Sequence, residues 1–370
     1  MAQSFDVCIR GDGMVARCLA LLLARDRLRV ALYRPPASAA PTEAAQADVR
    51  AYALNRASRE LLTTLRVWPE SPLSTPMTGM QVWGDDGGRL DFAPPEGLGQ
   101  MAWLVEVPAL ESQLAQALHF APEVHTVTDL ADVKAALTVV CEGPSSRSRS
   151  EFGVQWMVKP YGQKALAARL ISSAEHGGVA RQWFQGGDIL ALLPMGGAGG
   201  RELALVWSVS HARAAQLQAL PAEEFTQAVQ AAVGLEAGHL QLSSLVMGWS
   251  LALGEAERWV GPGWALAGDA AHTVHPLAGQ GLNLGLADVR VLAQVLQERE
   301  YWRALGDEKL LRRYERARRA DVWAMGLVTD GLQGLFSHSD ARWQALRNWG
   351  MSALGRNRFA TAWLTRQAMD

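Results

Sequence analysis

The spacing of apolar residues predicts a strand–helix–strand unit at the start of the chain. Residues 5–9 and 28–33 are short apolar runs typical of buried strands, and between them Val15, Leu19 and Leu23 follow one another at helical spacing. Two parallel strands joined by a helix form the βαβ unit from which dinucleotide-binding folds are built. A further buried strand is predicted at 138–141.

The pattern changes beyond residue 152, where apolar residues alternate with polar ones. Runs at 166–171, 189–193 and 203–209 lie between glycine-rich turns and predict antiparallel strands, and another strand is predicted at 245–253. Residues 80–92 alternate in the same way across an Asp-Asp-Gly-Gly turn, which predicts a β-hairpin.

Helical spacing predicts the connections between these strands. Apolar residues spaced as on one helix face run from Leu54 to Leu65, which predicts a helix that includes both. A second helix is predicted to begin at Pro108 and a third to cover 223–233. From residue 301 onward the pattern is helical and rich in arginine.

These elements predict an α/β protein with a Rossmann-like domain, an inserted, mainly antiparallel β-sheet domain and a C-terminal helical region. The Rossmann-like domain is expected to be discontinuous. The expected boundaries are residues 1–75, 96–154 and 254–300 for the Rossmann-like domain, 76–95 and 155–253 for the inserted domain, and 301–370 for the helical region.

A glycine pattern follows the first strand directly. Gly11, Gly13 and Ala16 form the sequence G-x-G-x-x-A, in which the glycines let a pyrophosphate approach a helix N-terminus. Two residues depart from the pattern: Asp12 brings a carboxylate beside the pyrophosphate position, and Arg34 stands where an acidic residue would bind a ribose. Arg34 is compatible with an NADP 2′-phosphate site, but we interpret it as a solvated surface residue.

Residues 264–287 carry the most specific pattern in the chain. A short apolar strand breaks at Gly268, is followed by the carboxylate of Asp269 and a polar turn, and leads at Gly279 into a helix. One face of this helix is apolar and consists of Leu282, Leu286, Val289, Leu292 and Leu296. A strand, an acid, a glycine-rich turn and a positive helix N-terminus predict a place for an anionic or hydroxyl-rich ligand.

Composition narrows the classes of function. A formal net charge of -2 argues against nucleic-acid binding as the function of the whole chain, and three scattered cysteines argue against a disulfide framework or a metal site. His272 and His275 lack a third ligand, so we predict no metal. No targeting or membrane-spanning segment is recognised, and the expected location is the cytoplasm. No obvious acid–base machinery is recognised either, which favours a cofactor that carries the chemistry.

Arginines and tryptophans accompany one another in residues 301–370. This mixture is compatible with a helical cap whose tryptophans pack inward, which the pattern favours, and with a surface that contacts a membrane or a lipid-bearing partner.

Several sequence blocks stand in the order of a known family. They are D-x-R at 48–50, YGQ at 161–163, LLP at 192–194, GDAAHTVHPLAGQGLNLGLAD at 268–288, RRYERARRAD at 312–321 and DGLQGLF at 330–336. With the N-terminal glycine pattern, they make the chain resemble the UbiH-type FAD-dependent hydroxylases of ubiquinone biosynthesis, within the para-hydroxybenzoate-hydroxylase-like flavoprotein monooxygenases. The resemblance covers nearly the whole length, and 268–288 is its most specific block.

The resemblance implies that the Rossmann-like domain binds FAD and that the chain is a monooxygenase, an oxidoreductase. In the mechanism it implies, reduced FAD reacts with dioxygen to give a C4a-hydroperoxide, which hydroxylates an aromatic ring. The inserted sheet of the substrate domain would cover this ring on the flavin's other face. The implied substrate is a lipid-like, polyprenylated phenol, and either NADPH or NADH is left open as the reductant. Two possibilities are left open for the location. The protein is either free in the cytoplasm or contacts the inner membrane or a biosynthetic complex through its C-terminal helices.

The family's site residues carry over onto matching positions. By the resemblance, Gly11 and Gly13 would approach the FAD pyrophosphate, with Ala16 as the third residue of the cofactor-binding pattern. Asp269, after Gly268, would hold a ribityl hydroxyl. The catalytic role falls to backbone N–H groups and a positive helix end at the flavin pyrimidine, with no acid–base residue assigned; this set is Pro276, Gly279, Gln280 and Gly281. The remaining cofactor contacts are Arg50, Glu142, Gly143, Leu282 and Asn283.

Arg50 is also compatible with an ordinary salt bridge at a helix entry. Residue type alone favours this structural role over contact with the cofactor. Glu142-Gly143 stands where the family has Asp-Gly. With Asp12 and Arg34, Glu142 makes three departures, all in the adenosine and pyrophosphate half of the predicted site. We expect FAD binding and leave open whether these residues weaken it.

Two other functions remain as alternatives. One is a catalytically lapsed relative that serves as a structural or accessory subunit of a ubiquinone-biosynthesis assembly, an idea prompted by the three departures. The other is an NADP-dependent dehydrogenase, which Arg34 suggests but which leaves residues 268–288 unexplained.

Overall fold

The computed structural model describes residues 3–35, 48–84, 88–94, 97, 99–197, 199–274 and 280–337. His275, Pro276 and Gly279 therefore lie outside the described residues, as does the stretch 338–370 of the predicted C-terminal region.

The first of three sheets has six strands in the order β16-β17-β9-β1-β2-β8 and is parallel except for the antiparallel pair of β16 with β17. Its strands are β1 (Gln3–Arg10), β2 (Val30–Tyr33), β8 (Val124–Val127), β9 (Val133–Val140), β16 (Val260–Gly261) and β17 (Trp264–Leu266). The βαβ unit predicted for the N-terminus is confirmed, and the strand predicted at 138–141 is the end of β9.

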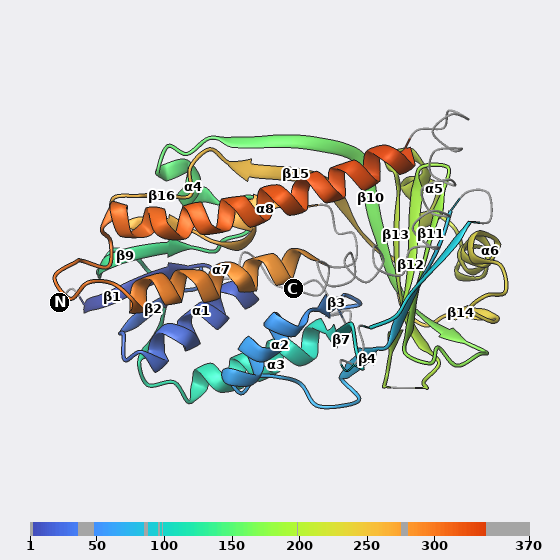
Figure 1. The fold of residues 1–370 in the computed structure, drawn as a ribbon, viewed down its shortest axis with the longest axis horizontal. Coiled ribbons are helices and arrows are strands. Elements are labelled where there is room, and N and C mark those ends of the chain that lie inside the picture. Colours follow the sequence, from blue (N-terminus) through green and yellow to red (C-terminus); the bar gives the residue numbers. More distant parts are fainter. Residues whose placement is uncertain are drawn as a thin grey trace.

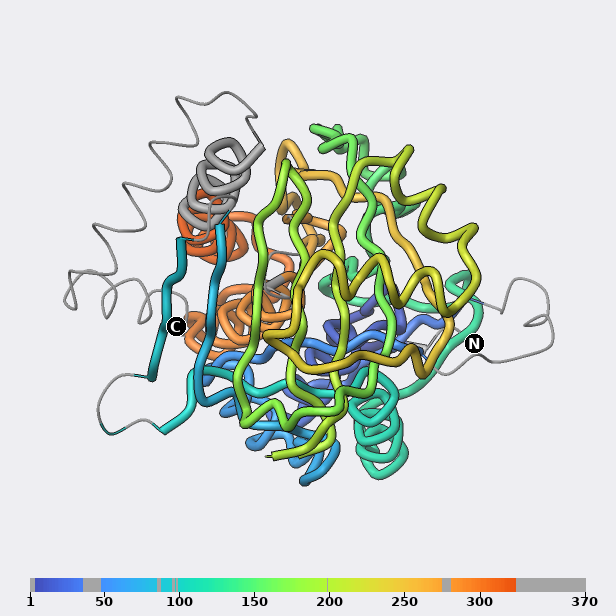
Figure 2. The backbone as a smooth tube through the Cα atoms, turned by 90° about the vertical axis from the view of Figure 1, so that its right-hand side faces the viewer, coloured from blue at the N-terminus to red at the C-terminus, as the bar shows by residue number. Residues whose placement is uncertain are grey.

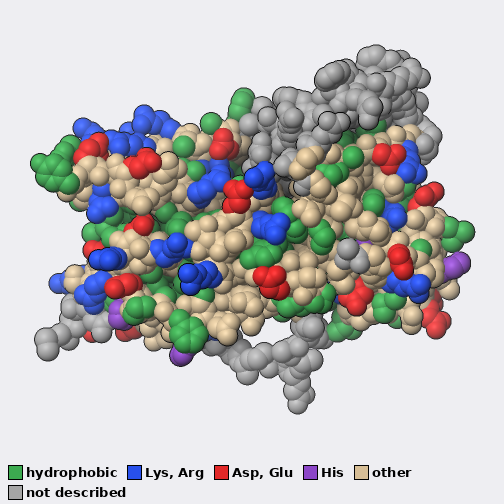
Figure 3. Space-filling view, turned by 60° about the horizontal axis from the view of Figure 1, so that its bottom comes forward, with side chains coloured by type: hydrophobic (Ala, Val, Ile, Leu, Met, Phe, Trp, Pro, Cys, Tyr) green, Lys and Arg blue, Asp and Glu red, His purple; other side chains and the backbone are tan. Residues whose placement is uncertain are grey.

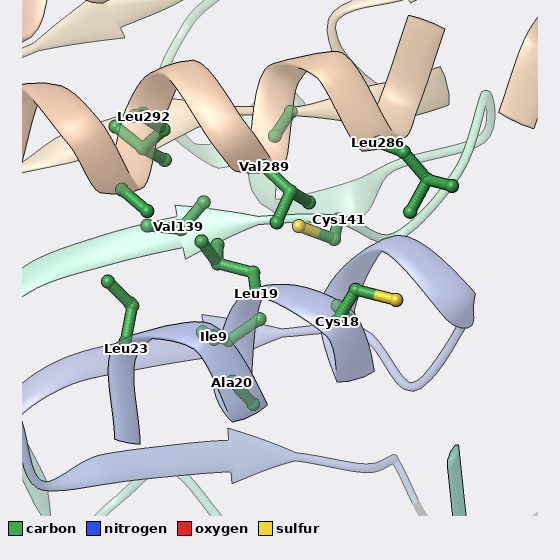
Figure 4. Packing of buried hydrophobic residues seen from close by; sticks show 14 of the residues in the cluster. Ile9, Cys18, Leu19, Ala20, Leu23, Val139, Cys141, Leu286, Val289 and Leu292 are labelled. Carbon is green, nitrogen blue, oxygen red and sulfur yellow. The ribbon is translucent and has the colours of Figure 1, made fainter. Parts of the chain in front are cut away.

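Helices α1 (Met14–Arg25) and α7 (Gln280–Gln297) pack against this sheet and against each other, and α8 (Glu308–Ser337) packs on α7. Figure 4 shows how apolar side chains of both helices and of the strands meet in one core. They include Ile9, Leu19, Leu23, Val139, Val289 and Leu292. The apolar face predicted for α7 is buried as expected.

The large sheet has nine strands in the order β18-β15-β10-β13-β12-β11-β5-β6, with β14 paired to β10. Its strands are β5 (Gly79–Trp83), β6 (Arg89–Phe92), β10 (Trp156–Ser172), β11 (Val179–Gln185), β12 (Asp188–Met195), β13 (Glu202–Ser210), β14 (Leu240–Leu242), β15 (Met247–Ala256) and β18 (His272–Thr273). The predicted antiparallel strands and the hairpin are confirmed. The pattern missed β11, because Arg181, Gln182 and Gln185 interrupt its apolar residues.

The third sheet has three strands in the order β3-β7-β4. Its strands are β3 (Ala51–Leu54), β4 (Ser74–Met77) and β7 (Ala102–Glu106). Helix α2 (Arg56–Thr64) follows β3 in the chain, and helix α3 (Val107–His119) follows β7. The prediction of one helix from Leu54 to Leu65 is therefore wrong at its start. Leu54 pairs with Trp103 across β7, and Asn55 caps α2 by accepting a hydrogen bond from Ser58 N at 2.9 Å. Strand pairing thus overrides the helical spacing of Leu54.

Figure 1 shows the parallel sheet with α1 and α7 on one side of the molecule and the large sheet on the other, with β10 and β15 running between them. In Figure 2 the large sheet stands in front of the half that contains the parallel sheet, so one of its faces looks toward that half. The other face is covered by α5 (His211–Gln218) and α6 (Ala222–Val233). The domain boundaries remain a prediction; β15 carries the large sheet to Ala256, past the boundary expected at 253.

On the described part of the face in Figure 3, acidic and basic side chains are interspersed rather than gathered by sign. This distribution is consistent with the small net charge of -2.

Candidate active site

The turn between β1 and α1 leaves room at a helix N-terminus. Gly11 has a φ of 125°, and a Cβ there would lie 2.4 Å from the carbonyl oxygen of Cys141, so only glycine fits between the ends of β1 and β9. Gly13 is the N-cap of α1 without a side-chain cap, and a Cβ on it would meet no atom within 4 Å. Gly13 is itself exposed, so the backbone at the start of α1 is accessible, as a phosphate site requires. Ala16 is buried in the helix packing.

Asp12 and Arg34, the two residues that depart from the dinucleotide-binding pattern, form an ion pair with each other. Arg17 donates from Nε to Asp12 Oδ1 at 3.1 Å and from Nη2 to Oδ2 at 3.0 Å, and Arg34 Nε lies 3.1 Å from the same Oδ2. The Arg34 side chain is 64% exposed, so it lies at the surface as predicted, but it is part of an ion pair. Two guanidinium groups offset the one carboxylate, so the cluster does not oppose a pyrophosphate.

Replacing Asp12 with asparagine is expected to leave FAD affinity unchanged or to raise it by no more than about fivefold, because the change releases two cations near the phosphates. Titration of the apoprotein with FAD, followed by flavin fluorescence, measures this effect. A clear loss of affinity would mean that the Asp12 carboxylate itself binds the cofactor.

A second glycine-rich turn, after β17, places Asp269 against the same helix end. Gly268 has a φ of 62°, and a Cβ on it would lie 3.3 Å from Val15 of α1. A Cβ on Gly285 of α7 would lie 2.7 Å from Val15 and 3.6 Å from the Gly268 Cα. The start of α1, the Gly268 turn and the first turns of α7 are thus in close contact, which brings the two predicted halves of the site together.

Asp269 lies in a short 3-10 helix (Gly268–Ala270). Its side chain is exposed to solvent, although neighbouring protein atoms partly remove its hydration. Loss of hydration there raises the pKa of Asp269; the charge of His272 lowers it, and that of Asp288 raises it further. Asp269 is therefore a solvent-exposed hydrogen-bond acceptor directly after the Gly268 turn.

The first turns of α7 lie against the Gly268 turn. Gln280 is its first residue, and a Cβ on Gly281 would meet no atom within 4 Å, so the backbone there is accessible. Leu282 is buried. The Asn283 side chain accepts from Asn55 N at 3.0 Å and from Ser58 Oγ at 2.7 Å, and it donates to Ala53 O at 2.8 Å. Asn283 therefore joins α7 to β3 and α2, and contact with a cofactor would come from its backbone.

Arg50 lies just before β3 and forms an ion pair with Asp48, to which its Nε donates at 2.9 Å. The salt bridge that residue type favoured is present, but at a strand entry rather than a helix entry. Burial alone would raise the pKa of Asp48, but the hydrogen bonds and charge of Arg50 hold it below its ordinary value. The guanidinium also lies 5.9 Å from the ring centre of Trp249 in β15, so Arg50 stands between the two halves of the protein.

Glu142 has a structural role through its side chain. Its carboxylate accepts from Ser146 Oγ at 2.8 Å, Ser148 N at 3.0 Å and Ser148 Oγ at 2.7 Å, at the start of α4 (Arg147–Glu151). Gly143 has a φ of 85° and an open surrounding. The longer side chain of glutamate thus serves the next helix, and only the backbone of 142–143 is left for a cofactor.

The large sheet has one face that looks toward the half with the parallel sheet. The side chains at the centre of this face are small and apolar. Ala204, Val206 and Ala191 pack toward β3, β4 and β7. Ala167 lies opposite Val206 on the same face. Val206 and Ala191 remain half-buried although they belong to central strands, so the sheet is not fully covered there. Trp249 continues this face toward Arg50; it was not among the predicted site residues, because a single tryptophan in a predicted strand does not reveal what faces it.

His272 is buried and hydrogen-bonded to Asp288 at 2.7 Å. Among the described residues, no group of three metal-ligating side chains comes together. Within the same part of the chain, no helix is long and apolar enough to cross a membrane.

Comparison with known proteins gives this geometry a context. Residues 105–327 match the family model described as an FAD binding domain. The chain is 32% identical to the ubiquinone hydroxylase UbiL of Rhodospirillum rubrum, covering 95% of this chain and 86% of the relative. It is 31% identical to the 3-demethoxyubiquinol 3-hydroxylase of Escherichia coli, covering 96% and 95%.

Solved structures have the same fold at lower identity. The p-nitrophenol 4-monooxygenase PnpA of Pseudomonas putida superposes with a TM-score of 0.74 at 15% identity, covering 99% of both chains. The Pseudomonas aeruginosa protein PqsL in complex with 2-aminobenzoylacetate superposes with a TM-score of 0.73 at 19% identity, covering 94% of this chain and all of that one.

Proposed function

Because the chain belongs to the family of FAD-dependent hydroxylases of ubiquinone biosynthesis, we propose that it hydroxylates the aromatic ring of a phenolic ubiquinone precursor with dioxygen. The observation that carries this proposal is the meeting of two glycine turns: Val15, in the first turn of α1, packs against Gly268, the residue that precedes the exposed Asp269. A phosphate-binding helix end beside a hydroxyl-binding carboxylate suits a flavin dinucleotide.

The residues present fit FAD. The first N–H groups of α1 would hold the pyrophosphate beside Gly13, and Asp269 would accept a hydrogen bond from the ribityl chain. The N-terminus of α7 at Gln280 and Gly281 would face the flavin pyrimidine, where its positive end favours negative charge on the ring. Bound FAD supplies the redox chemistry and the activation of dioxygen. The predicted roles of Pro276 and Gly279 belong to the same helix start but lie outside the described residues.

The remaining residues bind and enclose the substrate. The small side chains at the centre of the large sheet leave space for an aromatic ring, and Trp249 and Arg50 close one side of this space. Apolar walls exclude water from the reacting ring. The charge of Arg50 is shared with Asp48, so the wall carries little net charge and suits a neutral, lipid-like phenol.

Hydroxylation is tested with a reconstituted protein, a ubiquinone-precursor phenol and isotopically labelled dioxygen. Incorporation of one labelled oxygen atom into the ring, dependent on added NADPH or NADH, is the expected result; comparison of the two nucleotides identifies the reductant. A protein that binds FAD and consumes no substrate would favour the accessory-subunit alternative.

Replacing Val206 with tryptophan is expected to fill the space over the sheet. FAD binding should be retained, while kcat/KM for the phenol should fall by about tenfold or more, because the ring loses its place. Steady-state kinetics and FAD titration measure the two effects separately. Leu245→Trp, at a position that is 55% exposed, is the matched control and should change neither.

Peripheral contact with the inner membrane or with a biosynthetic complex through the C-terminal helices stays a proposal. It is supported by the arginine- and tryptophan-rich composition of 301–370. Co-sedimentation with anionic vesicles tests the membrane contact.

A further inference from the structure

A buried ionic cluster lies directly behind Asp269. Asp288 of α7 is fully buried, and His272 and Arg318 are each 3% exposed. Asp288 Oδ2 accepts from Gly268 N at 2.8 Å and contacts His272 Nε2 at 2.7 Å, while Oδ1 accepts from Arg318 Nε at 2.8 Å. One carboxylate therefore ties together the Gly268 turn, β18 and α8.

Helix α8 holds this cluster in place with further contacts. Arg318 also donates to Leu284 O at 3.4 Å, and Tyr314 Oη donates to Leu266 O, at the end of β17, at 2.8 Å. The ring of Trp259 stacks on His272 at 4.8 Å. The strand and the turn that present Asp269 are thus supported from behind by α7 and α8 together.

The buried carboxylate of Asp288 accepts the hydrogen bond of the Gly268 N–H. Gly268 adopts a φ of 62° in the turn immediately before Asp269, and its N–H would be unpaired and buried without Asp288. A buried carboxylate is costly unless it is paired and hydrogen-bonded. Asp288 meets both conditions, and in doing so it fixes the conformation of the residue that precedes the predicted FAD ligand.

We propose that Asp288 is a positioning residue of the FAD site: through Gly268 it sets where Asp269 presents its carboxylate, and through Arg318 it makes α8 part of that site. This inference rests on the proposed role of Asp269 in FAD binding. It adds a carboxylate that touches neither cofactor nor substrate but acts through its neighbour.

The same geometry couples the charges of the two carboxylates. Burial alone would raise the pKa of Asp288, but His272 and Arg318 hold it below its ordinary value, so Asp288 stays ionised. Its charge helps to raise the pKa of Asp269. The other titratable groups around the two carboxylates are Tyr52, Cys141, His272, Tyr314 and Arg318. FAD affinity should therefore fall with acid at a higher pH than an ordinary aspartate would give, because the ionised form of Asp269 is the better hydrogen-bond acceptor.

The first test replaces Asp288 with asparagine, which keeps an acceptor for Gly268 N and removes the charge. FAD titration by fluorescence across pH is expected to give near wild-type affinity at neutral pH, with the acid midpoint of FAD binding shifted to lower pH. The charge lost in this variant lies behind Asp269, so a purely structural role would leave the midpoint where it is in the wild type. An unchanged midpoint overturns the proposal.

The second test replaces Asp288 with alanine, which also removes the acceptor. FAD should then bind about tenfold more weakly, because the Gly268 turn no longer holds Asp269 in one place and binding has to order it. Asp321→Asn is the matched control, because Asp321 is an exposed partner of the same Arg318 at 2.6 Å; its FAD affinity and acid midpoint should match the wild type. A folded alanine variant with wild-type affinity contradicts the proposal, and if this variant does not fold, the asparagine variant decides alone.

Failure of this inference is distinguishable from failure of the proposed function. A wild-type protein that binds no FAD rejects the function. A wild type that binds FAD, loses it on Asp269→Ala and is indifferent to both Asp288 variants rejects only the positioning role.

Discussion

Asp269→Ala is expected to weaken FAD binding by roughly 10- to 100-fold, the loss typical of one hydrogen bond to a charged group. The reason is geometric: Asp269 is a solvent-exposed acceptor directly after Gly268, which packs against Val15 of α1 and Gly285 of α7. FAD affinity is measured by fluorescence titration of the apoprotein at neutral pH.

The same substitution should leave the ligand-free protein at least as stable as before. The folded protein raises the pKa of Asp269, so at neutral pH the ionised carboxylate opposes folding, and its removal relieves this cost. This contribution disappears as the pH falls and the carboxylate becomes protonated in both states. Thermal unfolding of the apoprotein at several pH values measures it.

Asp188→Ala is the matched control for Asp269→Ala. Burial also raises the pKa of Asp188, but this residue pairs with Arg213 at 3.1 Å on the side of the large sheet that α6 covers. FAD affinity should be unchanged in this control. Equal FAD affinity in the wild type and in Asp269→Ala would show that Asp269 is not a ligand.

Substitutions at Gly11 and Gly13 are expected to separate protein stability from FAD affinity in the turn between β1 and α1. Gly11→Ala is expected to lower the free energy of unfolding by about 2–5 kcal/mol, because the new Cβ strains a positive φ and overlaps the backbone of Cys141. Gly13→Ala should cost about 1 kcal/mol or less, because its φ of -78° suits alanine and its Cβ meets nothing.

FAD binding should respond to Gly13→Ala despite this small cost. The added Cβ occupies the space through which the pyrophosphate approaches α1, so FAD should bind about tenfold or more weakly. Urea unfolding of the apoproteins and FAD titration give the two quantities for each variant. A Gly13→Ala protein with wild-type affinity would place the pyrophosphate elsewhere.

Patterns within one element were predictable from the sequence. The βαβ unit and α7 each bury a continuous apolar face, so spacing alone reveals them. The glycine turns were recognisable because each directly follows a predicted strand in the chain. Leu54 was assigned to a helix, since its pairing with Trp103 depends on a strand forty-nine residues away.

Contacts between distant residues were not predictable from pattern. Asp12 and Glu142 looked like defects of a cofactor site, but Asp12 pairs with Arg34 and Glu142 caps α4. Asp288 was recognised only as the last residue of the 268–288 block. Its role was not predictable, because its partners His272 and Arg318 come from β18 and α8. Local spacing determines which elements form, whereas tertiary contacts determine what a polar side chain does.

The most direct test of the central claim is the visible absorption spectrum of the purified full-length protein after incubation with FAD and removal of the unbound cofactor. We expect the bands of protein-bound flavin at one FAD per chain, and their loss in Asp269→Ala. A folded wild-type protein that stays colourless under these conditions would contradict assignment as an FAD-dependent hydroxylase.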